Sequence, residues 1–372
     1  WVLDYLAAWE DRTRKNNGIL PDNVGLSGDV GQYNDGKWWG GYYGWRWPHG
    51  SFSLLEPLSI AGMNAALLTG EMRHLDLLRS QLDMLWGLRK TEAGQELVPN
   101  RHYDEGWRDY RLPHPMFGVY LWNVSMEEED AQRAERGWAS DIFDTVNPAY
   151  SSYGQNTAGG HMGFNGNTAQ WFSFMRGRDP GYPVALLTAN LKTISEQIAN
   201  YRRDENDPET MDHYRESMTI HMWQQLTPMI IEGLTQLTLG GPMHVYHGGL
   251  QLARFRYFDA IARRPGLPPG VAALVDGLTH DGATLTLVNT DASAAAEVVI
   301  QGGVFGEHDI TSVTLGEGAP LPTSGRWLTV RLAPGATARL TRRMQRFVRP
   351  PSYDTPWVRA ADGPAPLLGR DL

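Results

Sequence analysis

Apolar residues recur at three- and four-residue spacing through much of the first 264 residues, which is the period of an amphipathic α-helix. The spacing is clearest over 71–89, EMRHLDLLRSQLDMLWGLR, and 53–69 repeats it. Segment 125–139 opens with a Ser followed three residues later by a Glu, the pattern of an N-terminal capping box. These three segments are therefore expected to be helices. Helices are also expected over four further segments: 1–12, 183–203, 215–238 and 249–262.

The pattern changes at about residue 271 to short segments in which apolar and polar residues alternate. Gly, Asn-Thr-Asp and Pro-Gly turns separate these segments, and such a sequence predicts antiparallel strands. We therefore expect a mainly α fold with a small antiparallel β domain at its end. The expected division is a helical catalytic domain over 1–264, the β domain over 271–346 and a Pro-rich tail over 347–372.

Four long loops rich in Gly, Asn, Tyr, Trp and His interrupt the helical pattern. Most connections between helices take only a handful of residues. Long loops with polar aromatic residues more often build a functional site at one end of a scaffold. The four loops are 20–50, 99–116, 147–168 and 240–249.

The first loop carries a ribbon of aromatic residues without aliphatic neighbours, YNDGKWWGGYYGWRWPHG. Flat rings stack on the apolar faces of sugars while their polar tips bind hydroxyls, so these rings are candidates for a sugar groove. Half of them are expected to fill the core instead. The substrate-binding candidates of this loop are Trp38, Trp39, Trp45, Arg46, Trp47 and His49.

The same loop contains three aspartates, Asp22, Asp29 and Asp35. Aspartates in such loops are more often turn or capping residues than catalytic acids. Asp22, between a Pro and an Asn, is the one retained as a catalytic candidate.

The second loop places Arg101 beside His102, and both are substrate-binding candidates. An arginine fork suits a carboxylate on a substrate. A surface network of salt bridges explains the same residues equally well, so both interpretations stay open.

The third and fourth loops hold the remaining candidates. The third sets a His among Asn, Tyr and Gly residues, with no Leu or Val nearby, which favours a functional role. Its catalytic candidates are His161, Tyr150, Tyr153 and Asn156, and its substrate-binding candidates are Asn165 and Asn167. The fourth loop adds His247 as a substrate contact. His244 lies three residues before it, but no acidic third ligand is evident, so we expect no metal.

Composition narrows the classes of protein. The chain has 372 residues, is 41% hydrophobic and carries a net charge of −9, which excludes a basic nucleic-acid-binding surface. No apolar run approaches the length of a membrane span, and there is no Cys. The chain opens on Trp1 inside an amphipathic pattern, so we expect further helices before it. Secretion or a periplasmic location is favoured if that preceding part carries a signal peptide, and a cytoplasmic location is the alternative.

Several catalytic signatures are missing from the sequence: a phosphate-binding loop, a dinucleotide fingerprint, a nucleophile elbow and a zincin pair. We therefore expect no cofactor. The expected partner is a poly- or oligosaccharide substrate, without nucleic acid.

Three stretches of the chain support a resemblance: GKWWGGYYGWRWPHG, AYSSYGQNTAGGHMGFNGN and GGPMHVYHGGLQLARFRYFD. A helical domain with such loops, followed by a small β domain, resembles the (α/α)-toroid carbohydrate-active enzymes. These are the six-hairpin glycoside hydrolases and the toroid polysaccharide lyases. The resemblance implies an (α/α) toroid, incomplete at its N-terminal side.

The resemblance leaves two chemistries open. A lyase removes a proton next to a uronate carboxylate with Asn, Arg, His and Tyr groups, and the loops are rich in these residue types. A hydrolase needs two carboxylates, about 5 Å apart for retention or about 6.5–9.5 Å for inversion. We favour β-elimination of a uronate-containing glycan with His161 and a nearby Tyr as base and acid. A hydrolase with an Asp/Glu pair and a non-catalytic glycan-binding protein remain the alternatives.

Overall fold

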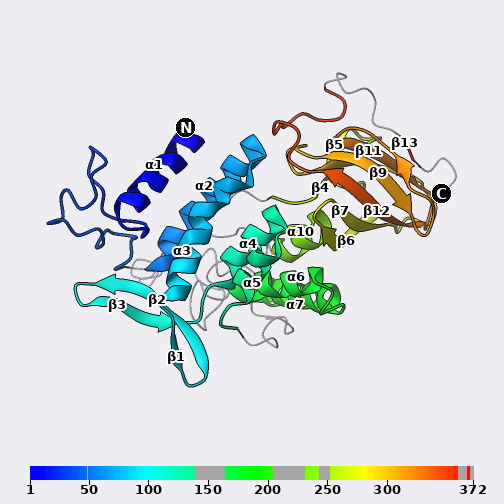
Figure 1. Ribbon diagram of the computed structural model, residues 1–372. Helices are drawn as coiled ribbons and strands as arrows, with labels where there is room; N and C mark the ends of the chain where they lie inside the picture. The colour runs from blue at the N-terminus through cyan, green and yellow to red at the C-terminus, as the bar shows by residue number, and fades with distance from the viewer. Residues whose placement is uncertain (48, 139–163, 204–230, 243–251, 359–366, 369–372) are drawn as a thin grey trace, which may run out of the picture. The chain divides into compact units, whose positions relative to one another are not determined.

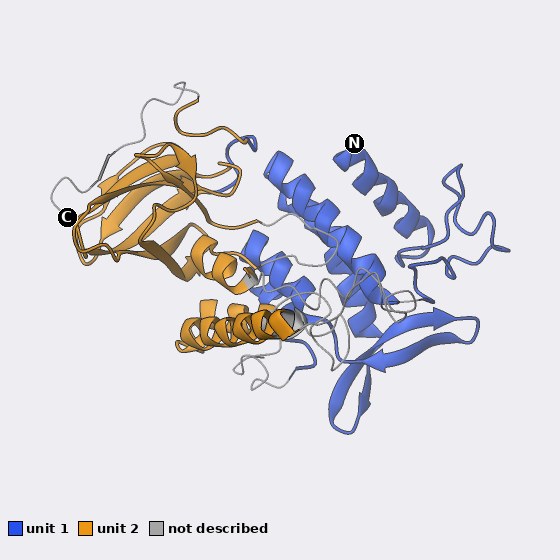
Figure 2. Cartoon of the chain, turned by 180° about the vertical axis from the view of Figure 1, so that it is seen from behind, with its two compact units in different colours: residues 1–140, 346–352 blue, residues 141–345, 353–372 orange. Residues whose placement is uncertain are grey.

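The computed structural model describes residues 1–47, 49–138, 164–203, 231–242, 252–358 and 367–368 (Figure 1). The chain forms two compact units, which Figure 2 shows in two colours. Unit 1 comprises Trp1–Ser140 with Arg346–Ser352, and unit 2 comprises Asp141–Gln345 with Tyr353–Leu372. Each unit is described by itself. The division into functional domains expected from the sequence stays a prediction.

Unit 1 is built around two buried helices, α2 and α4. Helix α2 ends at Gly70, whose left-handed conformation (φ 76°) closes the helix. Helix α4 is buried along its whole length. Gly118 of α4 is required there, because a Cβ atom would lie 2.3 Å from the backbone nitrogen of Ala134 in the next helix. The helices of unit 1 are α1 (Val2–Lys15), α2 (Ser51–Thr69), η1 (Met72–Leu75), α3 (Asp76–Gly87), α4 (Pro115–Ser125) and α5 (Glu128–Glu135).

One helix of the described residues, α2, is long and apolar enough to cross a membrane, and 67% of its apolar window is buried in the structure. A core helix of a globular unit passes the same test of length and composition. The expectation of no membrane span stays a prediction.

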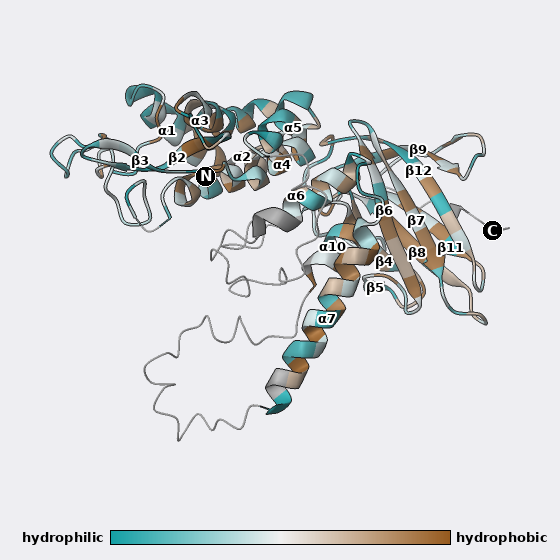
Figure 3. Ribbon diagram, turned by 90° about the horizontal axis from the view of Figure 1, so that it is seen from below, coloured by the Kyte–Doolittle hydropathy of each residue, from teal (hydrophilic) through white to brown (hydrophobic). Residues whose placement is uncertain are grey.

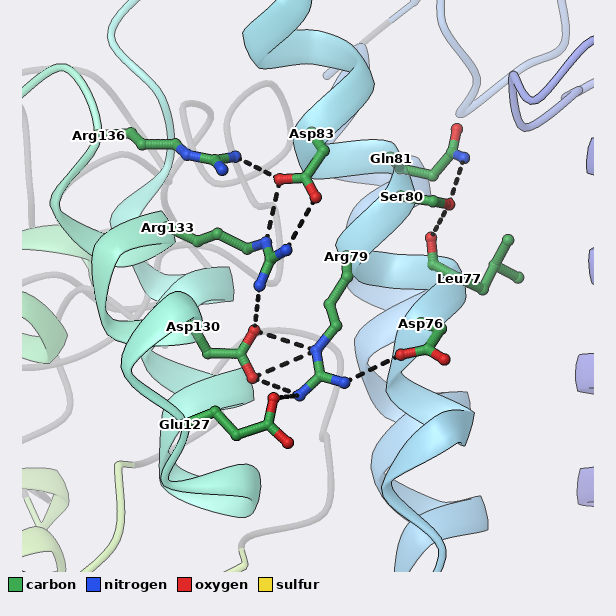
Figure 4. A network of polar contacts seen from close by, with 10 residues as sticks. All are labelled: Asp76, Leu77, Arg79, Ser80, Gln81, Asp83, Glu127, Asp130, Arg133 and Arg136. Atoms are coloured by element: carbon green, nitrogen blue, oxygen red, sulfur yellow. Dashed lines mark hydrogen bonds and ion pairs between the residues drawn. The ribbon is translucent and has the colours of Figure 1, made fainter.

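A network of ion pairs joins α3 to α5 in unit 1 (Figure 4). Asp130 is fully buried at its centre, with Oδ2 2.6 Å from Nη2 of Arg79 and Oδ1 2.7 Å from Nη1 of Arg133. Ser125 donates a further hydrogen bond to Asp130 (2.6 Å), and Arg133 continues to Asp83 (2.8 Å). A buried carboxylate is tolerated only when its oxygens are saturated by such partners. The network therefore fixes how α5 packs on α3.

Unit 1 also contains a three-stranded antiparallel sheet in the order β1-β2-β3. Its strands are β1 (Lys90–Glu92), β2 (Gln95–Tyr103) and β3 (Gly106–Arg111). The register places His102 opposite Trp107 and Arg101 opposite Arg108. This hairpin covers most of the region that the sequence analysis treated as the loop 99–116.

Unit 2 consists of helices followed by two five-stranded sheets. The helices are α6 (Phe164–Met175), α7 (Tyr182–Arg203) and α10 (Glu232–Leu239). The sheets have the strand orders β10-β9-β12-β7-β6 and β13-β11-β8-β4-β5, and every pair is antiparallel except β11 with β13. The strands are β4 (Phe255–Asp259), β5 (Arg264–Pro265), β6 (Val271–Thr279), β7 (Gly282–Asn289), β8 (Ala296–Gly302), β9 (Asp309–Leu315), β10 (Leu321–Pro322), β11 (Trp327–Leu332), β12 (Thr337–Gln345) and β13 (Leu367–Leu368).

The two sheets of unit 2 face each other across an apolar interior. Strand β12 alternates exposed and buried residues along its whole length, as expected for a strand with one solvated face. Its inward-facing Arg342 lies with its guanidinium carbon 4.9 Å from the ring centroid of Phe255 in the opposite sheet. Phe258, Val299 and Trp327 form a separate buried cluster on the other face of the β4 sheet, and Trp357 packs against it. The unit therefore contains a β-sandwich.

The expected mainly α, (α/α)-toroid fold is wrong. The part of the chain that the structure describes has eight α-helices, with about 36% of residues helical and about 27% in strands of three sheets. One cause is segment 249–262, which was expected to be a helix but contains strand β4. Phe255, Tyr257 and Phe258 in β4 are all buried, and a strand buried on both faces has clustered apolar residues that imitate helical spacing. A second cause is that long aromatic loops were taken as toroid loops, whereas one of them forms the β2–β3 hairpin.

Candidate functional site

The loop between α1 and α2 in unit 1 is held by the carboxylate of Asp22. Oδ1 of Asp22 accepts a hydrogen bond from the backbone nitrogen of Gly41 (3.0 Å), and Oδ2 accepts one from that of Trp45 (2.5 Å). The backbone nitrogen of Asp22 donates to the carbonyl of Trp38 (2.9 Å). Gly44 packs so closely that a Cβ atom would lie 2.0 Å from Oδ2 of Asp22. The carboxylate therefore gathers residues 38–45 into one fixed turn.

Asp22 is half-buried, and its burial raises the pKa of its carboxyl group above 3.8. The hydrogen bonds from Gly41, Trp45 and Gly40 oppose this rise. These contacts are those of a turn residue. A catalytic role for Asp22 stays a prediction.

The rings of the loop separate into two groups, of which the first is turned inward. This first group, which we call the inner aromatic group, consists of Trp38, Trp39, Trp45, His102 and Trp107. Trp45 is completely buried, and its indole nitrogen donates to the carbonyl of Leu20 (2.7 Å). Ring centroids lie 6.4 Å apart between Trp38 and Trp45 and 5.1 Å apart between Trp45 and Trp107. The group joins the loop to the β2–β3 hairpin as a small aromatic core.

The second group of rings is exposed on the surface of unit 1. This second group, which we call the ring platform, consists of Tyr42, Tyr43 and Trp47. Their exposed fractions are 72%, 50% and 50%. The ring centroid of Tyr42 lies 4.7 Å from that of Tyr43 and 4.9 Å from that of Trp47. His49 is half-buried beside it, with its ring centroid 6.0 Å from that of Tyr43. Three large rings, with Tyr42 in contact with the other two, thus face solvent on a loop whose base is fixed.

Charged side chains occur on the same loop and on the adjoining hairpin. Arg46 is exposed, and its guanidinium carbon lies 5.6 Å from the ring centroid of Tyr103. Lys37 pairs with Asp104 (2.9 Å), and its hydrogen bond lowers the pKa of that carboxyl group. Arg101 pairs with a carboxylate of its own hairpin, Asp109, at 3.5 Å. Arg46 is therefore an exposed cation next to the ring platform that lies over a ring, and its charge also lowers the pKa of Asp104.

His102 lies within the inner aromatic group and serves the packing of the loop. Its backbone nitrogen donates to the carbonyl of Trp45 (3.3 Å), and its ring centroid lies 4.6 Å from that of Trp38. Burial lowers the pKa of His102, although the charge of Asp104 opposes the shift. The ring is therefore neutral at physiological pH.

A family model described as a domain of unknown function (DUF8034) matches residues 1–98 and 88–235 of the chain. The chain belongs to the DUF8034 family. No curated protein and no solved structure matches the chain. The loop, the hairpin and the ring platform all lie within the part that matches the DUF8034 model. The family description assigns no activity to them.

The structure brings together the candidates of the first two loops and leaves others undescribed. The loop 20–50 and the hairpin that contains Arg101 and His102 meet in unit 1. Some candidates lie outside the described residues: Tyr150, Tyr153, Asn156, His161 and His247. Asn165 and Asn167 fall in the first turn of α6, but their side chains are outside the described part.

Two aromatic residues of the hairpin escaped the sequence analysis. Trp107 joins the inner aromatic group, and Tyr103 lies under Arg46. The strand register pairs Trp107 with His102, so both rings lie on one face of the hairpin. The sequence RHYDEGWRDYR does contain a signal for this aromatic face, because aromatic residues alternate there with charged ones. The charged residues drew attention to salt bridges instead.

A small pocket lies near the buried His114 of unit 1, with a volume of about 30 Å³. Leu55, Trp86 and Arg133 contribute to its lining. A space of this size is large enough for a water molecule and too small for a sugar ring. Burial, helped by the charge of Arg111, lowers the pKa of His114 to about 3, so its ring is neutral. Within the residues that the structure describes, no group of three His, Asp or Glu side chains is placed to hold a metal ion.

Proposed function

We propose that the chain binds a uronate-containing poly- or oligosaccharide on the ring platform of Tyr42, Tyr43 and Trp47. The observation that carries this proposal is a group of three large exposed rings on a fixed loop, in which Tyr42 contacts both Tyr43 and Trp47. Exposed apolar patches on a protein surface mark binding sites more often than isolated exposed residues do. The C–H faces of sugar rings pack on such rings, while the phenol hydroxyls and the indole nitrogen bond sugar hydroxyls.

The charge beside the ring platform supports an acidic sugar. Arg46 is exposed next to Trp47 in the sequence, and its planar guanidinium group is oriented on the ring of Tyr103. An arginine fork binds a carboxylate through two parallel hydrogen bonds. The carboxylate of a uronate can therefore pair with the guanidinium group of Arg46, whereas a neutral sugar has no charged group to pair with it.

Cleavage of the bound glycan by β-elimination is the second part of the proposal, and it rests on the sequence. His161 is the proposed base, Tyr150 or Tyr153 the acid, and Asn156 the group that neutralises the carboxylate. In the lyase reaction the base takes the proton next to the uronate carboxylate, and the C4–O bond breaks as the acid protonates the leaving oxygen. The contacts of two carboxylates favour β-elimination over hydrolysis, because Asp22 accepts hydrogen bonds from backbone nitrogens and Asp104 pairs with Lys37.

The binding test is isothermal titration of the full chain with a panel of neutral and uronate oligosaccharides. We expect binding of a uronate oligosaccharide that weakens as salt is added, because the carboxylate–arginine contact is screened. Arg46→Gln should remove the preference for the acidic sugar and keep stacking. A chain that binds no member of the panel would refute the proposal.

The cleavage test follows the ultraviolet absorbance of the unsaturated product together with new reducing ends. Absorbance that His161→Ala abolishes without unfolding the chain supports β-elimination. Reducing ends without absorbance indicate a hydrolase. Binding without either product indicates a non-catalytic glycan-binding protein.

A further inference from the structure

The turn of the β2–β3 hairpin carries two adjacent acidic residues, Asp104 and Glu105. They connect Tyr103, the last residue of β2, to Gly106, the first of β3, and the register pairs these two flanking residues. Figure 3 shows hydrophilic residues at this end of the hairpin. Both acidic residues are exposed, but only Asp104 forms an ion pair within the described part of the chain.

Asp104 links the hairpin to the loop that carries the ring platform. Oδ1 of Asp104 lies 2.9 Å from Nζ of Lys37, and the two side chains remain 57% and 41% exposed. The hydrogen bond from Lys37 lowers the pKa of Asp104, and the charge of Arg46 and a hydrogen bond from the side chain of Trp39 add to this effect. Asp104 is therefore ionised at neutral pH and lies in the electrostatic field of two cations.

Arg46 is held close to the same turn by Tyr103. Its guanidinium carbon lies 5.6 Å from the ring centroid of Tyr103, whose hydroxyl accepts a hydrogen bond from Nη1 of Arg101 (3.5 Å). Tyr103 and Asp104 are consecutive residues, so the ring that supports Arg46 and the carboxylate that partly neutralises it belong to one turn. A single carboxylate thus serves as counter-ion for both Lys37 and Arg46.

We propose that Asp104 stands in for the carboxylate of the sugar and sets how tightly a uronate binds beside the ring platform. This inference rests on the proposed function. A uronate carboxylate that approaches Arg46 is repelled by Asp104 and finds Lys37 already paired. Because an exposed ion pair is weak, the ligand can displace Asp104 into solvent and take over both cations.

The exchange of one carboxylate for another has a consequence for specificity. A small free anion gains little from it, because the new ion pair only replaces an old one. A ligand that also stacks on the ring platform gains the ring contacts in addition. Asp104 therefore favours acidic sugars over other anions as a specificity-determining residue, without a role in the chemistry.

The test is isothermal titration of the full chain carrying Asp104→Asn with a uronate oligosaccharide and with a neutral one. The variant keeps the shape of the side chain and removes its charge. The uronate should bind about two- to fivefold more tightly, the size of one exposed ion pair, and with a steeper dependence on salt. Affinity for the neutral sugar should not change. Glu105→Gln is the matched control, because it removes the same charge from the adjacent position and should bind both sugars like the wild type.

Adding Lys37→Met to Asp104→Asn tests whether the gain comes from Lys37. The double variant should return to about the affinity of the wild type, because the released cation is then missing. Three results would overturn the inference and leave uronate binding in place: equal affinity of Asp104→Asn and the wild type, an equal gain in Glu105→Gln, or a gain that survives Lys37→Met. Uronate binding by none of these proteins would overturn both proposals. Binding by Asp104→Asn alone would support the inference and refute uronate binding by the wild type.

Discussion

Replacing Asp22 by Ala tests whether its carboxylate builds the loop that carries the ring platform. The substitution removes the acceptors of two backbone N–H groups, those of Gly41 and Trp45. A hydrogen bond to a charged group contributes about 1.5–3 kcal/mol to stability, so the gross loss is about 3–6 kcal/mol. The carboxylate of Asp22 is itself half-buried, and removing it relieves that desolvation cost. We therefore expect a net loss of about 2 kcal/mol in the free energy of unfolding.

The pH dependence of this effect has a definite sign. Burial raises the pKa of Asp22 above the unfolded value of 3.8, so the folded state favours the protonated carboxyl. The stability that follows from this shift is fully present below the unfolded pKa and is lost as the pH rises through the raised folded pKa. The difference in unfolding free energy between the wild type and Asp22→Ala should therefore shrink from acidic to neutral pH.

The assay for Asp22→Ala is urea unfolding followed by tryptophan fluorescence, because the inner aromatic group reports directly on this loop. Asp29→Ala is the matched control: Asp29 is an exposed aspartate of the same loop, and its side chain accepts a hydrogen bond from Ser27 (2.8 Å). The control should cost less than about 0.5 kcal/mol. Equal stability of the wild type and Asp22→Ala at neutral pH would refute the role given to this carboxylate.

Three further substitutions test the packing of the two units by thermal and urea unfolding. Asp130→Ala should lower the free energy of unfolding by about 3 kcal/mol, because it removes the fully buried carboxylate that joins Arg79 to Arg133. Asp76→Ala removes an exposed partner in the same network and should cost less than about 1 kcal/mol; similar costs would contradict the central place of Asp130. Gly44→Ala should destabilise by more than about 1 kcal/mol, since its Cβ would lie 2.0 Å from Oδ2 of Asp22, and a neutral effect would show that the loop is not so tightly closed. Arg342→Met should raise the free energy of unfolding by about 1 kcal/mol. The guanidinium of Arg342 is buried with no hydrogen-bond partner among the described residues, and burial lowers the pKa of Arg342 to about 10. A marked loss of stability in the variant would show that the charge is compensated.

The sequence predicts those parts of the fold in which one face of an element is solvated. Helical spacing over 71–89 and 183–203 corresponds to α3 and α7, and the alternation after residue 271 corresponds to the antiparallel strands β6 to β12. The prediction of a helix over 249–262 is wrong because both faces of β4 are buried, and the apolar pattern then loses the two-residue period of a strand. The toroid was inferred from the character of the loops, and loops do not determine how helices and sheets pair over long distances.

The candidate site was predictable as a region but not residue by residue. The sequence analysis expected half of the rings in the core and half at the surface, and Trp45 is buried while Trp47 is exposed. These two residues are of the same type and only two positions apart. Their different environments depend on Asp22, whose carboxylate bonds the backbone of Trp45 from 23 residues away. Such a long-range contact leaves no local pattern in the sequence.

Titration of a uronate oligosaccharide into ring variants tests the central claim most directly. Tyr42→Ala and Trp47→Ala remove members of the ring platform, and Tyr33→Ala is the control because Tyr33 is a 71% exposed tyrosine of the same loop outside the platform. Each platform variant should bind about tenfold more weakly, as expected when one stacking ring is lost, while Tyr33→Ala should bind like the wild type. Equal affinity of all four proteins would contradict the account.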